Sequence, residues 1–162
     1  MKINFSQAIK GSSSFGVASG IITTLGLIVG INASTHSKAA VIGSILTIAV
    51  ADSFSDALGI HFSEESGNDD DTAVWEATIV TFLTKLLIPL TFIIPVLLFK
   101  LDTAIWVNII WSFSILTILS YILAKHHRKD SKMAILEHLF ITIVVIIITY
   151  YLGGWIESYF DI

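Results

Sequence analysis

Apolar and polar positions follow one another along this chain in long blocks, without the short period of an amphipathic helix or strand. The apolar blocks are each close to the roughly 20 residues that a helix needs to cross a bilayer, and brief polar segments separate them. The pattern predicts transmembrane helices over Phe15–Ala33, Ala39–Phe62, Ala73–Phe99, Thr103–Ala124 and Met133–Ile156.

The connections between these five predicted helices are short. The polar turn after the first block covers residues 32–38, and only residues 100–102 separate the third block from the fourth. Short connections make consecutive helices antiparallel neighbours. We therefore expect an all-α bundle that forms one transmembrane domain over residues 1–162, with an acidic loop over residues 63–72 and no separate soluble domain.

The basic residues predict how the bundle is oriented. One set of connections and the N-terminal segment hold six Lys and Arg residues, and the other connections hold two: Lys2, Lys10, Lys125, Arg128, Lys129 and Lys132 against Lys38 and Lys100. Because cytoplasmic loops carry the excess of Lys and Arg, the N-terminus and the acidic loop are expected in the cytoplasm.

Composition excludes several classes of protein. Hydrophobic residues make up 54% of the chain and charged residues 14%, well below the roughly 25% of a soluble domain. The absence of cysteine excludes disulfides and thiolate metal sites, and the net charge of −4 does not favour a nucleic-acid partner. No HExxH, GxSxG or glycine-rich phosphate motif is present, so we expect no enzyme and no permanently bound cofactor, and the bilayer itself as a partner.

Two aspartates lie inside the second predicted helix. A carboxylate at the centre of a bilayer costs about 2.5–3.5 kcal/mol, so Asp52 and Asp56 point to a function. Their spacing of four places them on one helix face, and Ser55 and Gly59 continue that face towards the cytoplasm. This predicts a polar vestibule that narrows at a carboxylate pair. Paired hard oxygen donors suit a divalent cation, and competing protons suit proton-coupled exchange.

A lysine, Lys85, occupies the middle of the third predicted helix. Three interpretations apply: neutralisation of an aspartate in a buried ion pair, an internal tethered cation on the transport pathway, or a side chain that extends to the interface. A buried pair with Asp52 or Asp56 is the preferred one. A purely structural ion pair is the alternative to a functional site.

Small residues form a stripe along the first predicted helix. Two GxxxG pairs, Gly16–Gly20 and Gly26–Gly30, allow another helix to approach closely. That helix belongs either to the same chain or to a second copy across a homodimer seam, and the stripe alone does not separate these alternatives.

Acidic residues are concentrated between the second and third predicted helices. Glu64 and Glu65 follow directly after the aspartate helix and are candidate metal ligands that raise the local concentration of cations. A solvated surface loop is the alternative explanation for the same run of charge.

Two segments resemble the vacuolar iron transporter family. The stretch over residues 15–31, FGVASGIITTLGLIVGI, is similar to the first helix of that family, and residues 51–66, ADSFSDALGIHFSEES, are similar to its second helix. The resemblance implies a five-helix homodimer that exports Fe²⁺ or Mn²⁺ from the cytoplasm in exchange for protons, along a path between the first two helices.

The chain departs from the family pattern at both motifs. Ser19 stands where the family has an aspartate, and Asp56 stands where it has a methionine. Exchange of a thioether for a carboxylate shifts the preference towards harder metals. On this basis Asp52 and Asp56 are expected as ligands and proton acceptors, with Ser19 and Ser55 as auxiliary oxygens. The glutamate-rich cytoplasmic domain of some members is missing.

Two further hypotheses belong to other classes. The chain is a non-transporting membrane scaffold if its remaining charges form only an internal salt bridge. It is a transporter of another small substrate if Lys85 holds an anionic group.

Overall fold

The computed structural model describes residues 5–67, 70–126, 128 and 130–160, and every regular element in that part is a helix. The helices are α1 (Phe5–Thr35), α2 (Lys38–Glu65), α3 (Asp71–Thr91), α4 (Ile93–Leu98), α5 (Leu101–His126) and α6 (Ser131–Phe160). Within the described residues, five segments are long and apolar enough to cross a membrane, with α3 and α4 together forming the third. The predicted all-α bundle of five spans is confirmed.

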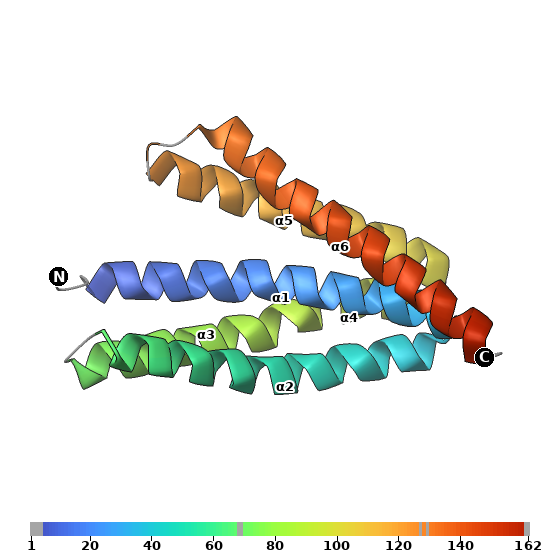
Figure 1. The fold of residues 1–162 in the computed structure, drawn as a ribbon, viewed down its shortest axis with the longest axis horizontal. Helices are drawn as coiled ribbons and strands as arrows, with labels where there is room; N and C mark the ends of the chain where they lie inside the picture. Colours follow the sequence, from blue (N-terminus) through green and yellow to red (C-terminus); the bar gives the residue numbers. More distant parts are fainter. Residues whose placement is uncertain (1–4, 68–69, 127, 129, 161–162) are drawn as a thin grey trace.

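Helix α1 lies between two pairs of helices, α2 with α3 on one side and α5 with α6 on the other (Figure 1). The start of α1 and the connections α2–α3 and α5–α6 lie at one end of the bundle, which we call the inner end. The connections α1–α2 and α4–α5 lie at the other, which we call the outer end. The basic residues predict that the inner end faces the cytoplasm.

The connections are shorter than predicted, because side-chain caps begin the helices early. The Asp70 carboxylate accepts a hydrogen bond of 3.0 Å from the Thr72 amide and so begins α3 at Asp71. Helix α2 extends through Glu65, so the expected acidic loop of residues 63–72 is wrong in its bounds. Residues 63–65 and 71–72 of the expected loop, which include Glu64, Glu65 and Asp71, therefore belong to the ends of α2 and α3.

The third span is broken near its outer end. Pro89 lies in the last turn of α3 and Pro95 in α4, and the helix is interrupted at Phe92. The amide of the buried Asn108 side chain on α5 donates a 3.2 Å hydrogen bond to the Phe92 carbonyl oxygen. This hydrogen bond ties the break in the third span to α5.

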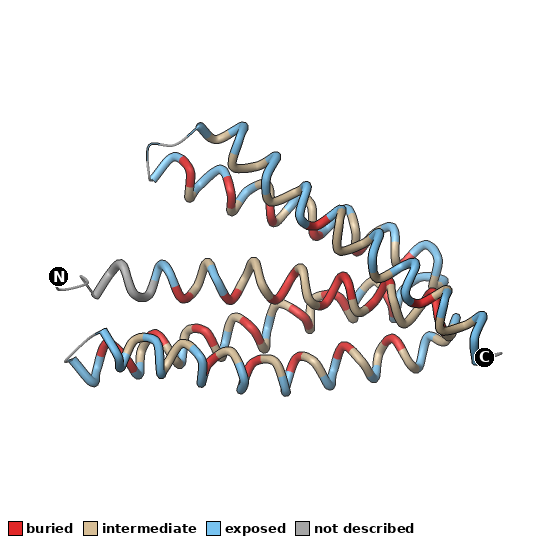
Figure 2. Tube along the Cα trace, in the orientation of Figure 1, coloured by how far each residue is buried: buried red, intermediate tan, exposed pale blue. Residues whose placement is uncertain are grey.

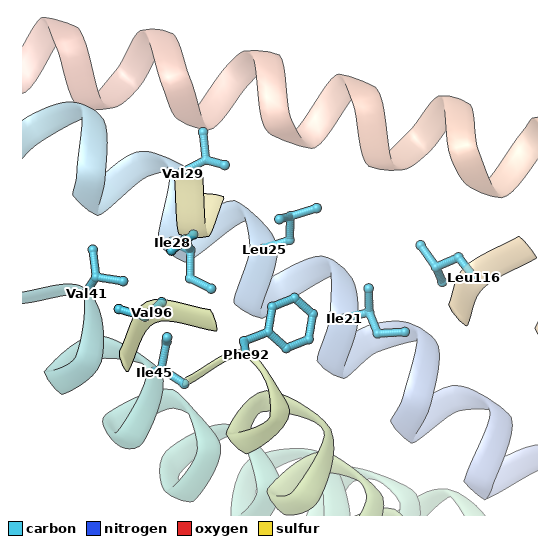
Figure 3. Close-up of a cluster of buried hydrophobic side chains, with 10 residues drawn as sticks. Ile21, Leu25, Ile28, Val29, Val41, Ile45, Phe92, Val96 and Leu116 are labelled. Carbon is cyan, nitrogen blue, oxygen red and sulfur yellow. The ribbon is translucent and has the colours of Figure 1, made fainter. Parts of the chain in front are cut away.

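The apolar core lies around α1, towards the outer end. Ile21, Leu25 and Ile28 of α1 are fully buried, and Phe92 packs among them (Figure 3). Burial falls off across the bundle, since α6 has few buried residues (Figure 2). The exposed Ile, Leu, Phe and Tyr side chains of α6 match the surface that a bilayer covers.

The glycine stripe of α1 explains how this helix occupies the centre. A side chain at Gly16 or Gly20 would meet Thr84 or Ile88 of α3. A side chain at Gly26 would lie 2.8 Å from Val145 of α6, and one at Gly30 would lie 3.4 Å from the Thr149 carbonyl oxygen. Helices of the same chain therefore pack against all four glycines.

Candidate functional site

A buried ion-pair cluster lies between α1, α2 and α3. The Lys85 ammonium on α3 contacts one carboxylate oxygen of Asp52, and lies 2.8 Å from Oδ2 of Asp56, both on α2. Lys85 is fully buried, whereas each carboxylate side chain is 23% exposed. The two aspartates reach one ammonium because they lie one helical turn apart on the same side of α2. The buried pair expected from the sequence is present.

Two hydroxyl groups of α1 complete the cluster. Lys85 Nζ donates a hydrogen bond of 2.9 Å to Ser19 Oγ, and Ser19 Oγ lies 3.4 Å from Asp56 Oδ2. Thr23 Oγ1 lies 3.2 Å from Asp52 Oδ2 and 2.8 Å from the Ser19 carbonyl oxygen, so its single hydrogen is shared between two acceptors. Each aspartate therefore faces one hydroxyl of α1.

Thr23 was not among the site residues predicted from the sequence. The signal was present, since Ser19 and Thr23 repeat on α1 the spacing of four that Asp52 and Asp56 have on α2. Neighbouring helices that each carry two polar residues one turn apart can meet at two levels, and the structure pairs them in that way.

The cluster carries one excess negative charge. Two carboxylates contribute −2 and the single ammonium contributes +1, which leaves −1 when all three groups are ionised. The ammonium donates hydrogen bonds to Asp52 and Ser19, and Asp56 is its second ion-pair partner. A net charge inside a membrane-spanning bundle is costly, so the cluster favours an additional proton or cation.

A cavity of about 520 Å³ begins beside the cluster and extends towards the outer end. Thr23 lines its inner part, and its other walls come mainly from α1 and α6, with Ile48 of α2. Apart from Thr23, Ser34 and Thr149, these walls are apolar or glycine. The expected vestibule was to open from the carboxylates towards the cytoplasm, whereas this cavity lies on the opposite side of them.

Two of the predicted pathway residues do not join the cluster. Ser55 and Gly59 are exposed on α2, and a side chain added at Gly59 would meet no atom within 4 Å. They lie on the side of α2 that faces away from the bundle, because Ala49, Ser53 and Ala57 form its buried side. Ser55 is therefore not an auxiliary oxygen of this site.

The acidic residues at the inner end differ from one another. Glu65 is exposed, whereas Glu64 has one buried carboxylate oxygen without a hydrogen-bond partner. Glu76 of α3 also has one buried carboxylate oxygen without a hydrogen-bond partner. The hydroxyl oxygen of the fully buried Thr81, one turn from Lys85, lacks a partner as well. Within the described residues, no three His, Asp or Glu side chains gather closely enough to hold a metal by themselves.

Comparison with known proteins identifies no relative: no family model, curated protein or solved structure matches this chain. Its function must therefore be inferred from the arrangement of its own residues.

Proposed function

We propose that this chain is an integral multi-pass membrane transporter that exports a divalent cation, such as Mn²⁺ or Fe²⁺, in exchange for protons. The observation that carries the proposal is the pair of partly exposed carboxylates, Asp52 and Asp56, held together inside the spans by one lysine. Ionisable residues at such depth mark ion pathways more often than they serve as structure.

In the proposal Lys85 is the internal competitor of the transported ion. Its ammonium occupies the position between the carboxylates that a cation would take. When a divalent cation binds between the carboxylates, the net charge of the cluster becomes 0 if the Lys85 ammonium moves away from them. The net charge becomes +1 if the ammonium stays beside them. Release of one proton from Lys85 restores neutrality in the second case. Charge balance in a low-dielectric site thus couples cation binding to proton release.

The oxygen donors define the class of cation. Asp52 and Asp56 supply carboxylates, and Ser19 and Thr23 supply hydroxyl oxygens at the same two levels. An all-oxygen site favours harder ions such as Mn²⁺ over soft ones. The resemblance of residues 15–31 and 51–66 to the vacuolar iron transporter family supports the same class of substrate and the same direction of transport.

A homodimer formed through α2 is part of the proposal. Small residues repeat every fourth position on the exposed side of this helix: Gly43, Thr47, Ala51, Ser55 and Gly59. A side chain at Gly43 or Gly59 would meet nothing within 4 Å, so this stripe is uncovered, unlike that of α1. A second copy packed on it would shield the exposed edges of the aspartates from lipid.

Transport is tested with purified protein in liposomes under an imposed pH gradient. We expect uptake of Mn²⁺ by the wild type that requires the gradient, and its loss in Asp52→Asn/Asp56→Asn. Asp102→Asn is the matched control, because Asp102 is exposed at the start of α5. Absence of Mn²⁺, Fe²⁺ and Co²⁺ movement by folded wild type would refute the proposal.

The dimer is tested by cross-linking, which the absence of native cysteine makes straightforward. A cysteine introduced by Ser55→Cys is expected to form a disulfide between copies in the membrane. Ile118→Cys, on an exposed face of α5, is the control and should remain monomeric. Equal cross-linking of both variants would show that contact through α2 is not specific.

A non-transporting scaffold is the second candidate, and the direct contact of Lys85 with both carboxylates favours it. A satisfied buried ion pair can be replaced by apolar groups with little loss of stability. If the chain is a scaffold, neutralisation of Asp52, Asp56 and Lys85 together leaves the assembly intact, and Mn²⁺ alters the stability of no variant.

A further inference from the structure

A second cavity lies at the inner end, apart from the ion-pair cluster. The α5–α6 hairpin diverges from α1 towards that end (Figure 1), and a cavity of about 550 Å³ lies between α1 and α5. Its lining is formed by Lys10, Gly11, Ser13 and Ser14 of α1 and by Leu119, Ile122, Leu123 and His126 of α5. The proposed transport function uses none of these residues.

The lining separates into a polar and an apolar part. Lys10 and His126 carry the nitrogen groups, and Ser13 and Ser14 add hydroxyls. Leu119 lies seven residues before His126 on α5, which is about 10 Å along a helix. The cavity is therefore basic and hydroxyl-rich at the inner end, and aliphatic towards the middle of the bundle. A phospholipid has the same arrangement, with its phosphate at the membrane surface and its acyl chains towards the middle of the bilayer.

The polar part lies at the level of lipid headgroups. In the sequence the apolar block of α1 begins at Phe15, after Lys10 and three serines, and that of α5 ends at Ala124, before His126. These polar residues therefore lie at the edge of the apolar segments. Lys10 is exposed and forms no ion pair with any described carboxylate. Ser14 likewise makes no side-chain hydrogen bond to a described residue. An ammonium and a hydroxyl at this level remain available to an anionic ligand.

We propose that this cavity binds one anionic phospholipid from the leaflet at the inner end. Its phosphate lies beside Lys10 and Ser14, and one acyl chain lies along Leu119, Ile122 and Leu123. Basic pockets between transmembrane helices on the cytoplasmic side are typical sites for such headgroups. The lipid fills the space where the hairpin separates from α1.

The experiment measures lipid binding to the full chain by native mass spectrometry in detergent. Phosphatidylglycerol is compared with phosphatidylcholine and with inorganic phosphate, for the wild type, Lys10→Gln and Lys125→Gln. Lys125 is the matched control, because it is a lysine at the same end that lies outside the cavity lining and over the Tyr121 ring. Both lysines are exposed, so neither substitution threatens folding.

We expect one tightly held phosphatidylglycerol per chain, bound at least about tenfold more weakly by Lys10→Gln, as for the loss of one charge-assisted hydrogen bond. Lys125→Gln should bind as the wild type does. Equal weakening by both substitutions would show diffuse attraction to a basic surface, and equal binding of phosphatidylcholine would show no headgroup selectivity. Displacement of the lipid by inorganic phosphate would show a simple anion site. Each of these three results overturns the proposal.

Discussion

The substitution Lys85→Met tests the cluster most directly, because it removes the only positive charge and keeps a side chain of similar length. Lys85 is fully buried, and its ammonium contacts two carboxylates and one hydroxyl. Removal of one partner from a buried ion pair costs about 3–5 kcal/mol, since the remaining charge is left without compensation. For a chain of this size the loss corresponds to a fall of roughly 6–20 °C in melting temperature.

The assay is thermal unfolding of Lys85→Met and of the wild type in detergent at one pH. Lys100→Met is the matched control, because Lys100 is exposed at the outer end and its loss should change stability by less than about 0.5 kcal/mol. If Lys85→Met and Lys100→Met have the same melting temperature, the Lys85 ammonium does not compensate buried charge in this cluster.

The same variant separates a transporter from a scaffold. With Lys85 replaced, the carboxylates of Asp52 and Asp56 are free to bind a divalent cation in place of the ammonium. Mn²⁺ at about a hundred times its dissociation constant would return about 2.7 kcal/mol of stability. The triple variant Asp52→Asn/Asp56→Asn/Lys85→Met should show no response to Mn²⁺. Equal responses from the two variants would place the bound metal elsewhere.

Two further predictions concern the packing around α1 and α5. Gly153→Ala should lower stability by about 1–3 kcal/mol, because a Cβ there would collide with the Gly30 carbonyl oxygen, whereas the neighbouring Gly154→Ala, which meets nothing within 4 Å, should not. Unfolding in denaturant checks both, and equal stabilities would contradict the close α1–α6 approach. Asn108→Leu should cost about 0.5–1.5 kcal/mol, because it removes the buried hydrogen bond that joins α5 to the Phe92 carbonyl oxygen; unchanged melting would show that this bond is not needed.

The fold was predicted from patterns within single segments of the chain. Five apolar blocks of membrane-crossing length predicted five helices. The structure places one helix across each of four of these blocks and two helices, α3 and α4, across the third. The bounds were less accurate, because caps such as Asp70 are local hydrogen bonds that extend a helix beyond its apolar block. The break at Phe92 also has a local cause in Pro89 and Pro95, but its partner Asn108 lies on another helix.

The candidate site was predictable where helix period alone applied. Asp52 and Asp56 share one side of α2 because they are four residues apart, and this is true of any α-helix. Their contact with Lys85, although preferred from the rarity of intramembrane charge, depends on how α3 packs against α2. Ser55 was assigned to the same side, yet the rotation of α2 about its axis leaves it exposed. A single sequence does not specify that rotation.

The sequence by itself determined that the helices have a lipid bilayer as their surroundings, how many spans there are, and which charged residues lie within them. Those properties follow from hydrophobicity and helix geometry along one segment. The tertiary structure decided which helix covers the glycines of α1, that Thr23 faces Asp52, and that the neighbouring cavity opens towards the outer end. These depend on the relative rotation and tilt of helices, which are set by side-chain packing between segments far apart in the chain.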